Sequence, residues 1–353
     1  MMEKINYKEL SFDSYDATYK NLIKLSDENI LNILNEMRDF EDNNKGYDFE
    51  SLILLFTDHK NNEIRLFCTK YMEKSSDFSL IRKLRKIINN ETEKEIRFHA
   101  INIFGNWIKE ISTKKNRMNE IGKLLNFGID FIKNSDDKSE QNNMMKSVSH
   151  LSNEEIDKII MEKFSSKELE DKLSAIISMG NNGNIKWVPL IEELLDHDNY
   201  QIRSESCISL SLIGNEENID QIKELLEDEE LDTQKAAVNA ISNIGGSYAK
   251  EILEKLKFSS EPEIVDLSKD KLLDLKKEDE IDSQPQPDED ILEDETISND
   301  FDEYDAANIE GWGSLNEDGT SFIAPDAIDD DIDDPIKSLS DYEKPIEQPD
   351  IDD

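Results

Sequence analysis

The second half of the chain contains an internal repeat. Residues 201–214 align without a gap with residues 232–245, at a shift of 31 residues. Small residues match small residues, as at Ser206 and Ala237, and apolar residues match apolar ones. A fixed period of this length is typical of repeat architectures, in which each repeat is one supersecondary unit. The repeat therefore constrains the fold more than any other feature of the sequence.

Each unit is predicted to be a helical hairpin. Residues 191–196 (Ile-Glu-Glu-Leu-Leu-Asp) match residues 222–227 (Ile-Lys-Glu-Leu-Leu-Glu), and their apolar residues follow the spacing of an amphipathic helix. An acidic turn follows, and then the second helix. Pro189 stands near the start of the first helix, where proline is tolerated. One hairpin cannot bury its apolar face alone, so stacked neighbours are needed to form a continuous core.

Earlier and more diverged copies share the start of the second helix. Residues 58–65 mirror residues 196–203, and the Ile-Arg pair returns at 96–97. We expect the isoleucine to fill the core at the start of that helix. The aspartate before the Ile-Arg pair is predicted to cap the helix N-terminus. The positions with a predicted structural role in the repeat are Asp58, Ile64, Arg65, Ile96, Arg97, Asp196, Ile202, Arg203, Gly214 and Gly245.

These residues give the chain a resemblance to HEAT repeats, in particular to the short bacterial HEAT-like units first named for phycobilisome lyases. The resemblance is carried by the Leu-Leu-Asp turn, the Ile-Arg start, the small residues at 206, 207 and 209, and the Ile-Gly end. It implies an all-α fold, a right-handed α-solenoid of about six to seven helical hairpins, in which the recurring arginine pairs with a turn acid of a neighbouring unit. It also implies a scaffold that binds other macromolecules along one face, although a fold does not fix a function.

The strength of the repeat predicts how the chain is organised. The repeat is clearest over 186–276 and blurs over 111–185, where the spacing leaves room for two irregular units. We expect a helical N-terminal cap, a HEAT-like solenoid and an acidic, disordered tail, at 1–46, 47–276 and 277–353.

Negative charge is concentrated in the tail. The formal net charge is −41, of which residues 277–353 contribute −26 and the rest of the chain −15. This acidity disfavours binding to nucleic-acid backbones and to anionic membranes, because both depend on Lys and Arg. The solenoid still contains a basic cluster, which could hold a phosphate-bearing ligand or the acidic tail. The residues of this cluster are Arg82, Lys83, Arg85, Lys86, Lys114, Lys115 and Arg117.

The tail is poor in large apolar residues. Ile, Leu, Val and Phe make up 15 of the 77 residues from 277 to 353, and six of the eight prolines lie there. With the charge, this composition predicts disorder. Aromatic residues set among acids and glycines favour a peptide that docks on a basic partner, beside the simpler role of a solubilising tail. The aromatic residues in question are Phe301, Tyr304, Trp312 and Phe322.

Catalytic motifs are absent from the sequence. It contains no Walker loop, no Gly-x-Ser-x-Gly motif and no dinucleotide fingerprint, and Cys68 and Cys207 are not spaced as zinc ligands. We therefore predict no metal, no cofactor and a non-enzymatic protein–protein adaptor. Two alternatives stay open: an enzyme or enzyme subunit of the bilin lyase-like HEAT class that acts in the concave groove, and nucleic-acid binding by the basic cluster.

The sequence also gives an expectation for location. It shows no apolar signal segment and no apolar run of membrane-spanning length, and its two cysteines suit a reducing compartment. We expect a soluble, cytoplasmic protein without membrane insertion, whose partners are proteins.

Overall fold

The computed structural model describes residues 15–44, 46–75, 80–113 and 118–282. Over these ranges the chain is all-α, with sixteen α-helices and no β-strand. All of these residues belong to the first of the two units into which the chain divides, which ends at Gln284.

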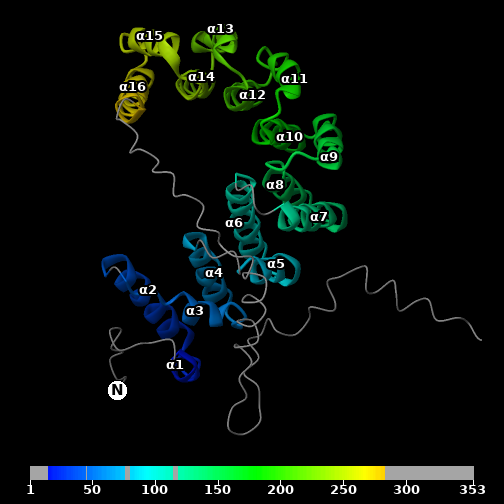
Figure 1. The fold of residues 1–353 in the computed structure, drawn as a ribbon, viewed down its shortest axis with the longest axis vertical. Helices are drawn as coiled ribbons and strands as arrows, with labels where there is room; N and C mark the ends of the chain where they lie inside the picture. Colours follow the sequence, from blue (N-terminus) through cyan, green and yellow to red (C-terminus); the bar gives the residue numbers. More distant parts are fainter. Residues whose placement is uncertain (1–14, 45, 76–79, 114–117, 283–353) are drawn as a thin grey trace, which may run out of the picture. The chain divides into compact units, whose positions relative to one another are not determined.

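The helices follow one another as hairpins, and the hairpins stack (Figure 1). The odd-numbered helices form the outer row: α1 Tyr15–Leu22, α3 Glu50–Ile53, α5 Ile81–Asn90, α7 Met118–Asn134, α9 Glu154–Phe164, α11 Val188–Glu192, α13 Ile219–Glu224 and α15 Gly246–Leu256. The even-numbered helices form the inner row: α2 Asp27–Asn43, α4 Asn62–Tyr71, α6 Lys94–Ser112, α8 Lys138–Val148, α10 Leu169–Asn182, α12 Tyr200–Ile213, α14 Leu231–Ile244 and α16 Pro262–Asp282.

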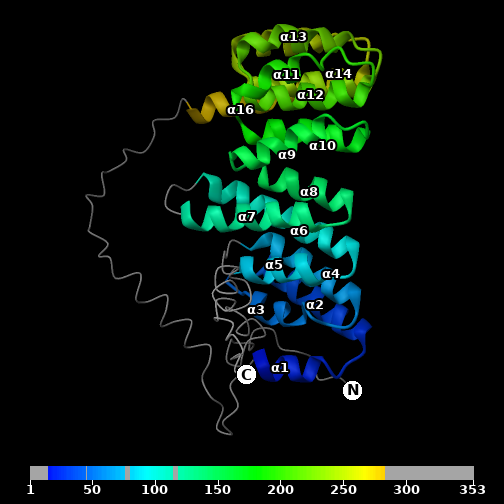
Figure 2. The same ribbon diagram turned by 90° about the vertical axis from the view of Figure 1, so that its right-hand side faces the viewer.

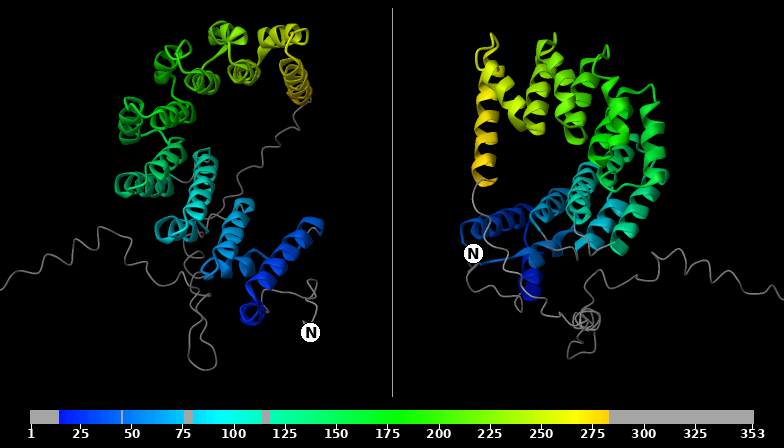
Figure 3. Two further views of the ribbon diagram at one scale, coloured as in Figure 1. Left: turned by 180° about the vertical axis from the view of Figure 1, so that it is seen from behind. Right: turned by 45° about the horizontal axis from the view of Figure 1, so that its top comes forward.

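The inner helices contact their neighbours along the whole row. In this row, α8 packs against both α6 and α10, and α12 packs against both α10 and α14. Figure 2 shows the hairpins as successive layers, and Figure 3 shows the inner and outer rows from behind. The fold is the predicted right-handed α-solenoid, in which seven hairpins follow the first one.

One core runs through most of the stack. A continuous cluster of buried apolar side chains extends from Leu54 to Ile252. The isoleucines of the Ile-Arg pairs lie in this core and in the clusters beside it: Ile64 is 0%, Ile96 2% and Ile202 3% exposed. They therefore fill the core, as the repeat predicts.

The residues that cap the inner helices differ from the prediction. Asn61 caps α4 and Asn199 caps α12, each through side-chain oxygens that accept from backbone N–H groups. Asp58 and Asp196 lie three residues earlier, in the turn, so the expectation that they act as caps was wrong. The chain takes up helical dihedral angles only after the asparagine, and a capping side chain must stand at that point.

Two glycines close repeat units for different reasons. Gly245 has φ +73°, a left-handed conformation that favours glycine. Gly214 has an ordinary φ of −83°, but a Cβ there would lie 2.5 Å from the Asn218 side-chain oxygen. Asn218 in turn accepts from the Asn215 N–H at 2.9 Å, so Gly214 leaves room for this turn.

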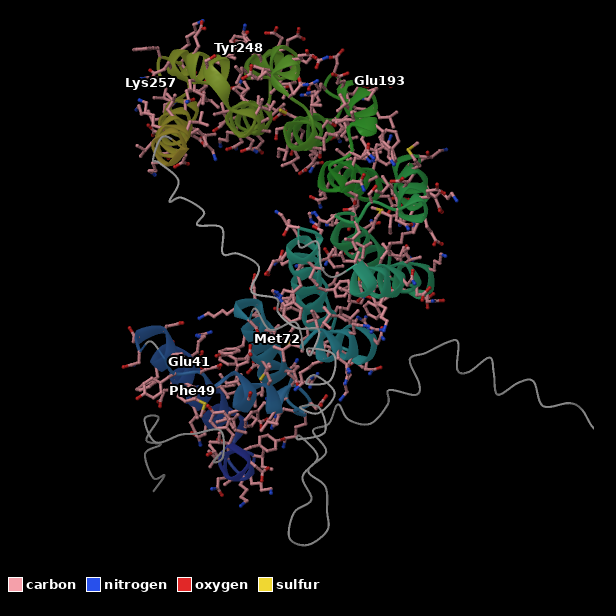
Figure 4. All side chains as sticks on the ribbon, in the orientation of Figure 1. Glu41, Phe49, Met72, Glu193, Tyr248 and Lys257 are labelled. Carbon is pink, nitrogen blue, oxygen red and sulfur yellow. The ribbon has the colours of Figure 1, made fainter. Side chains whose placement is uncertain are left out.

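The N-terminal segment packs as a further hairpin at the start of the stack. The Glu41 carboxylate accepts hydrogen bonds from the Phe49 N–H and from the Tyr71 hydroxyl, the latter at 2.5 Å (Figure 4). The Tyr15 hydroxyl donates to the carbonyl of Asp48 at 2.6 Å. These bonds join the first hairpin to the second.

The remaining hairpins fill the region where the repeat blurs. The hairpins α7–α8 and α9–α10 lie between the clearer copies, in the number that the spacing predicted. At the other end of the stack, α16 continues to Asp282, so the helical part extends beyond residue 276.

Candidate functional site

The repeated arginines tie successive hairpins together at the turns. Arg65 donates to both carboxylate oxygens of Glu91, at 2.7 and 3.0 Å, and to the carbonyl of His59 at 2.8 Å. Arg203 makes the same contacts with Asp228, at 2.7 and 2.8 Å, and with the carbonyl of His197 at 2.8 Å. Each arginine thus binds its own turn and the turn of the next unit.

The acids of these pairs are held in the charged form. The Arg203 hydrogen bonds lower the pKa of Asp228 and outweigh the effect of its burial. Burial would raise the pKa of Glu91, but hydrogen bonds from Arg65 and from two backbone N–H groups hold it below its ordinary value. These side chains join neighbouring hairpins, and their hydrogen bonds within the chain already engage them.

A surface pocket of about 330 Å³ lies beside the first of these pairs. Two pairs of its charged wall residues are matched within the chain, since Arg65 binds Glu91 and Lys86 binds Asp58 at 3.1 Å. Among the described residues, no group of three or more His, Cys, Asp or Glu side chains could hold a metal ion.

The predicted basic cluster lies on α5, in the outer row. Lys83 donates to the carbonyl of Leu54 at 2.8 Å, Lys86 pairs with Asp58, and the Arg85 guanidinium lies 4.7 Å from the centre of the Phe127 ring. Arg82 is exposed on the same helix. Lys83, Arg85 and Lys86 thus contact their own solenoid. Lys114, Lys115 and Arg117 lie outside the described residues, as do the tail residues Phe301, Tyr304, Trp312 and Phe322.

The inner face of the stack presents a different surface. On α12, Ile208 and Leu212 are 36% and 54% exposed, although both are large and apolar. Their counterparts on α14, at a shift of 31 residues, are Asn239 and Asn243, and Asn181 lies on α10. This part of the inner face therefore presents both apolar and amide side chains.

Two charged residues interrupt this surface. Lys146 on α8 and Glu205 on α12 are both half-buried, and each perturbs the other electrostatically across α10. Burial lowers the pKa of Lys146, against the attraction of Glu170 and Glu205. Burial raises the pKa of Glu205, against the attraction of Lys146.

The sequence analysis missed this inner-face site. A signal was present in the aligned copies, because the apolar residues at 208 and 212 change to asparagine at 239 and 243, whereas Leu210 and Ile213 are matched by the apolar residues Ile241 and Ile244. Such alternation marks positions that do not face the core. No sequence signal pairs Lys146 with Glu205, since they lie in different hairpins.

Comparison with known protein families gives a match over one part of the chain. The sequence profile of HEAT repeats matches residues 164–265. No curated protein has a sequence that matches the chain. None of the described helices combines the length and the apolar character that a membrane span requires.

Solved repeat proteins are similar at low sequence identity. The CpcE–CpcF complex of phycocyanin lyase from Nostoc sp. PCC7120 is 12% identical, with a TM-score of 0.44, over 66% of this chain and 97% of that one. Kap95p, from a structure with RanGDP, is 10% identical, with a TM-score of 0.47, over 76% and 41%. A designed armadillo repeat protein in complex with the peptide (KR)4 is 18% identical, with a TM-score of 0.32, over 55% and 98%.

Proposed function

We propose that the chain is a non-enzymatic scaffold, and the match of the HEAT-repeat profile to residues 164–265 supports this proposal. Its inner face, centred on α10, α12 and α14, binds a segment of a protein partner. The stacked hairpins make this face continuous, and a continuous face of this kind can hold an extended ligand.

The exposed apolar pair on α12 carries the proposal. Ile208 and Leu212 are one helical turn apart, so they form a single apolar strip on the inner face. The neighbouring amides of Asn181 and Asn239 each donate one hydrogen bond to a backbone carbonyl of the chain. Each retains a carbonyl oxygen and a second N–H, which suit the backbone of a bound segment. An apolar strip rimmed by amides suits a protein partner better than it suits a phosphate backbone, which is bound by Lys and Arg.

The test compares two ways of adding acidic residues to the surface. The double variant Ile208→Asp/Leu212→Asp should lose captured partner proteins by about tenfold or more, because a central apolar contact is worth at least about 1.4 kcal/mol. The matched control is Ile185→Asp, in the short helix before α11, where Ile185 is 75% exposed. Partners are captured from a cell extract and quantified by mass spectrometry.

The control should retain the wild-type set of partners. Circular dichroism should show unchanged helix content in both proteins. If the double variant captured the same partners in the same amounts as wild type, the inner face would not be the binding surface.

We further propose that the acidic tail engages a basic partner. Support comes from the sequence alone: residues 277–353 carry a net charge of −26, and aromatic side chains are spaced among the acids. Opposite charge would speed the encounter with a basic protein, and the aromatic residues would supply contact area.

The tail is tested by ending the chain after Asp282, the last residue of α16. The truncated chain should lose binding to an immobilised lysine-rich peptide. A full-length variant with Phe301, Tyr304, Trp312 and Phe322 replaced by serine separates an aromatic contribution from charge alone. If truncation instead strengthened the binding of a single-stranded DNA probe, the tail would act by covering the basic cluster. Unchanged binding of both probes would leave it as a solubilising segment.

A further inference from the structure

Lys146 and Glu205 form an unusual pair on the inner face. They lie on helices that are not adjacent, since α10 stands between α8 and α12. Among the described residues, neither charged group has an ion-pair or hydrogen-bond partner. Most other partly buried charges in the solenoid are matched directly, as Lys163 is with Asp171 at 3.1 Å.

This arrangement is costly for the free protein. Burial opposes the charged form of both groups, and their mutual attraction over α10 offsets this only in part. A ligand that supplied a closer charge to each group would recover part of the cost of desolvation. The other ionisable groups nearby are Glu170 and His150, and the pKa of His150 is itself lowered by burial and by Lys109.

The helix between the two charges, α10, presents an apolar side chain, because Ile177 is only half-buried. On α12, Ile208 stands one turn after Glu205 and is exposed. A ligand that spans the two charges would therefore cross an apolar surface.

From the half-buried positions of Lys146 on α8 and Glu205 on α12, and from the apolar Ile177 and Ile208 on the helices beside them, we infer that the two charges select an extended partner segment that carries one acidic and one basic side chain with an apolar residue between them. The acidic side chain would bind Lys146, the basic side chain would bind Glu205, and the apolar one would lie on Ile177 and Ile208. The inference rests on the proposed function and specifies the chemistry of the partner at that surface.

The dimensions fit an extended segment. In an extended chain, residues i, i+2 and i+4 point to one side, and the first and last are about 13 Å apart at about 3.3 Å per residue. Two helix-packing steps from α8 to α12 span about 16–20 Å, and the two long side chains reach inward from both ends. The expected pattern is therefore acidic, any, apolar, any, basic.

Four peptides test the pattern on the full-length protein. They share one serine-rich frame with a central leucine, and they differ only at positions i and i+4: Glu and Lys, Glu and Glu, Lys and Lys, or Gln and Gln. Each is immobilised at high density on a biosensor surface, so that weak binding is measurable. Wild type should retain the Glu/Lys peptide about fivefold to tenfold more strongly than the others, because like-charge contacts are penalised.

Charge reversal should change the preferred peptide. Lys146→Glu places two acids on the surface and should favour the Lys/Lys peptide, and Glu205→Lys should favour the Glu/Glu peptide. Lys158→Glu and Glu162→Lys, at exposed positions on outer helix α9, make the same changes in net charge and should keep the wild-type ranking. The neutral variants Lys146→Gln and Glu205→Gln should lose the preference for Glu/Lys even if a reversal disturbs folding.

The inference would be overturned if wild type retained the four peptides equally or retained none. It would also be overturned if the ranking did not follow the charges at 146 and 205. The proposed function fails separately, through unchanged partner capture by Ile208→Asp/Leu212→Asp. A docking face without charge selection would lose partners in that variant while the peptide ranking stayed constant.

Discussion

The regular units around α12 and α14 and the irregular region of α6 to α8 build the same contact in different ways. Arg203 reaches Asp228, 25 residues later, in the turn before α14. Arg97 reaches Glu140, 43 residues later, inside the first turn of α8. In both regions the arginine binds a nearly buried carboxylate of the next unit.

The difference comes from the length of the outer helix. α7 has 17 residues, whereas α13 has 6. The longer hairpin breaks the sequence period, but the N-terminus of the next inner helix still lies beside the arginine. The stack therefore preserves the spatial relation of neighbouring inner helices, and it does not require a constant repeat length.

The first prediction concerns the greatest loss of stability, and it tests whether the Arg203–Asp228 and Arg97–Glu140 pairs are equivalent. Arg203→Gln and Arg97→Gln should each reduce the unfolding free energy by about 2–4 kcal/mol, because each leaves a buried carboxylate unpaired. Glutamine suits the position, because Gln234 is the counterpart of Arg203 at a shift of 31 residues. Gln234 donates to the turn carbonyl of Asp228 at 2.6 Å. Urea denaturation followed by circular dichroism measures the change.

The control for these variants is an exposed pair. Lys70 lies 3.7 Å from Glu95, and both side chains are largely exposed. Lys70→Gln should change stability by less than about 1 kcal/mol. A clearly smaller loss for Arg97→Gln than for Arg203→Gln would show that the irregular unit is held by other contacts.

Acid should weaken the same pairs. The pKa of Asp228 is lower in the folded chain than its ordinary value of 3.8, and that of Glu91 is lower than 4.5, so the unfolded chain binds more protons. Their contribution is present above these ordinary values and is lost as the pH falls through the folded values, by up to about 1.4 kcal/mol per pH unit for each group. The difference between wild type and Arg203→Gln should therefore shrink in urea titrations below pH 3.8. A constant difference would mean that Arg203 stabilises by packing alone.

The next prediction tests how closely the inner helices approach one another. A Cβ at Gly180 would lie 2.9 Å from the backbone Cα of Ser209, and a Cβ at Gly105 would lie 2.6 Å from the Ser147 hydroxyl. Gly180→Ala should cost about 1–3 kcal/mol, because α10 and α12 must separate. Gly105→Ala should cost a similar amount, since the Ser147 Cβ and backbone Cα would also lie 2.9 and 3.1 Å from the new Cβ.

Substitution of Gly122 should change stability in the opposite direction. No atom lies within 4 Å of a Cβ built there, within helix α7. Gly122→Ala should stabilise the chain by about 0.5–1 kcal/mol through helix propensity. Thermal unfolding measures all three variants, and equal midpoints for Gly122→Ala and Gly180→Ala would contradict close packing of α10 on α12.

The last prediction concerns the caps. Asn199→Ala and Asn61→Ala should each cost about 1 kcal/mol, because each removes the acceptor for the first backbone N–H groups of its helix. Asp196→Ala and Asp58→Ala should cost less than about 0.5 kcal/mol. Urea denaturation measures these losses of stability. If the aspartate variants lost more stability than the asparagine variants, the aspartates would be the caps in both regions.

The sequence predicts the repeat unit because each unit solves the same local problem. Helical periodicity places Ile64, Ile96 and Ile202 on a buried face, and the structure confirms all three in the core. The cap was misassigned because aspartate and asparagine both cap well, and sequence alone does not fix the residue at which the helix begins.

The hairpin, its buried isoleucine and its small residues can be predicted from the sequence, since they follow from local periodicity and from the need to stack. Three relations are seen only in the folded chain: Arg97 binds Glu140, Ile208 and Leu212 face outward from the core, and Lys146 lies across α10 from Glu205. These relations join residues from different hairpins, and stacking brings such residues together irrespective of their separation along the chain.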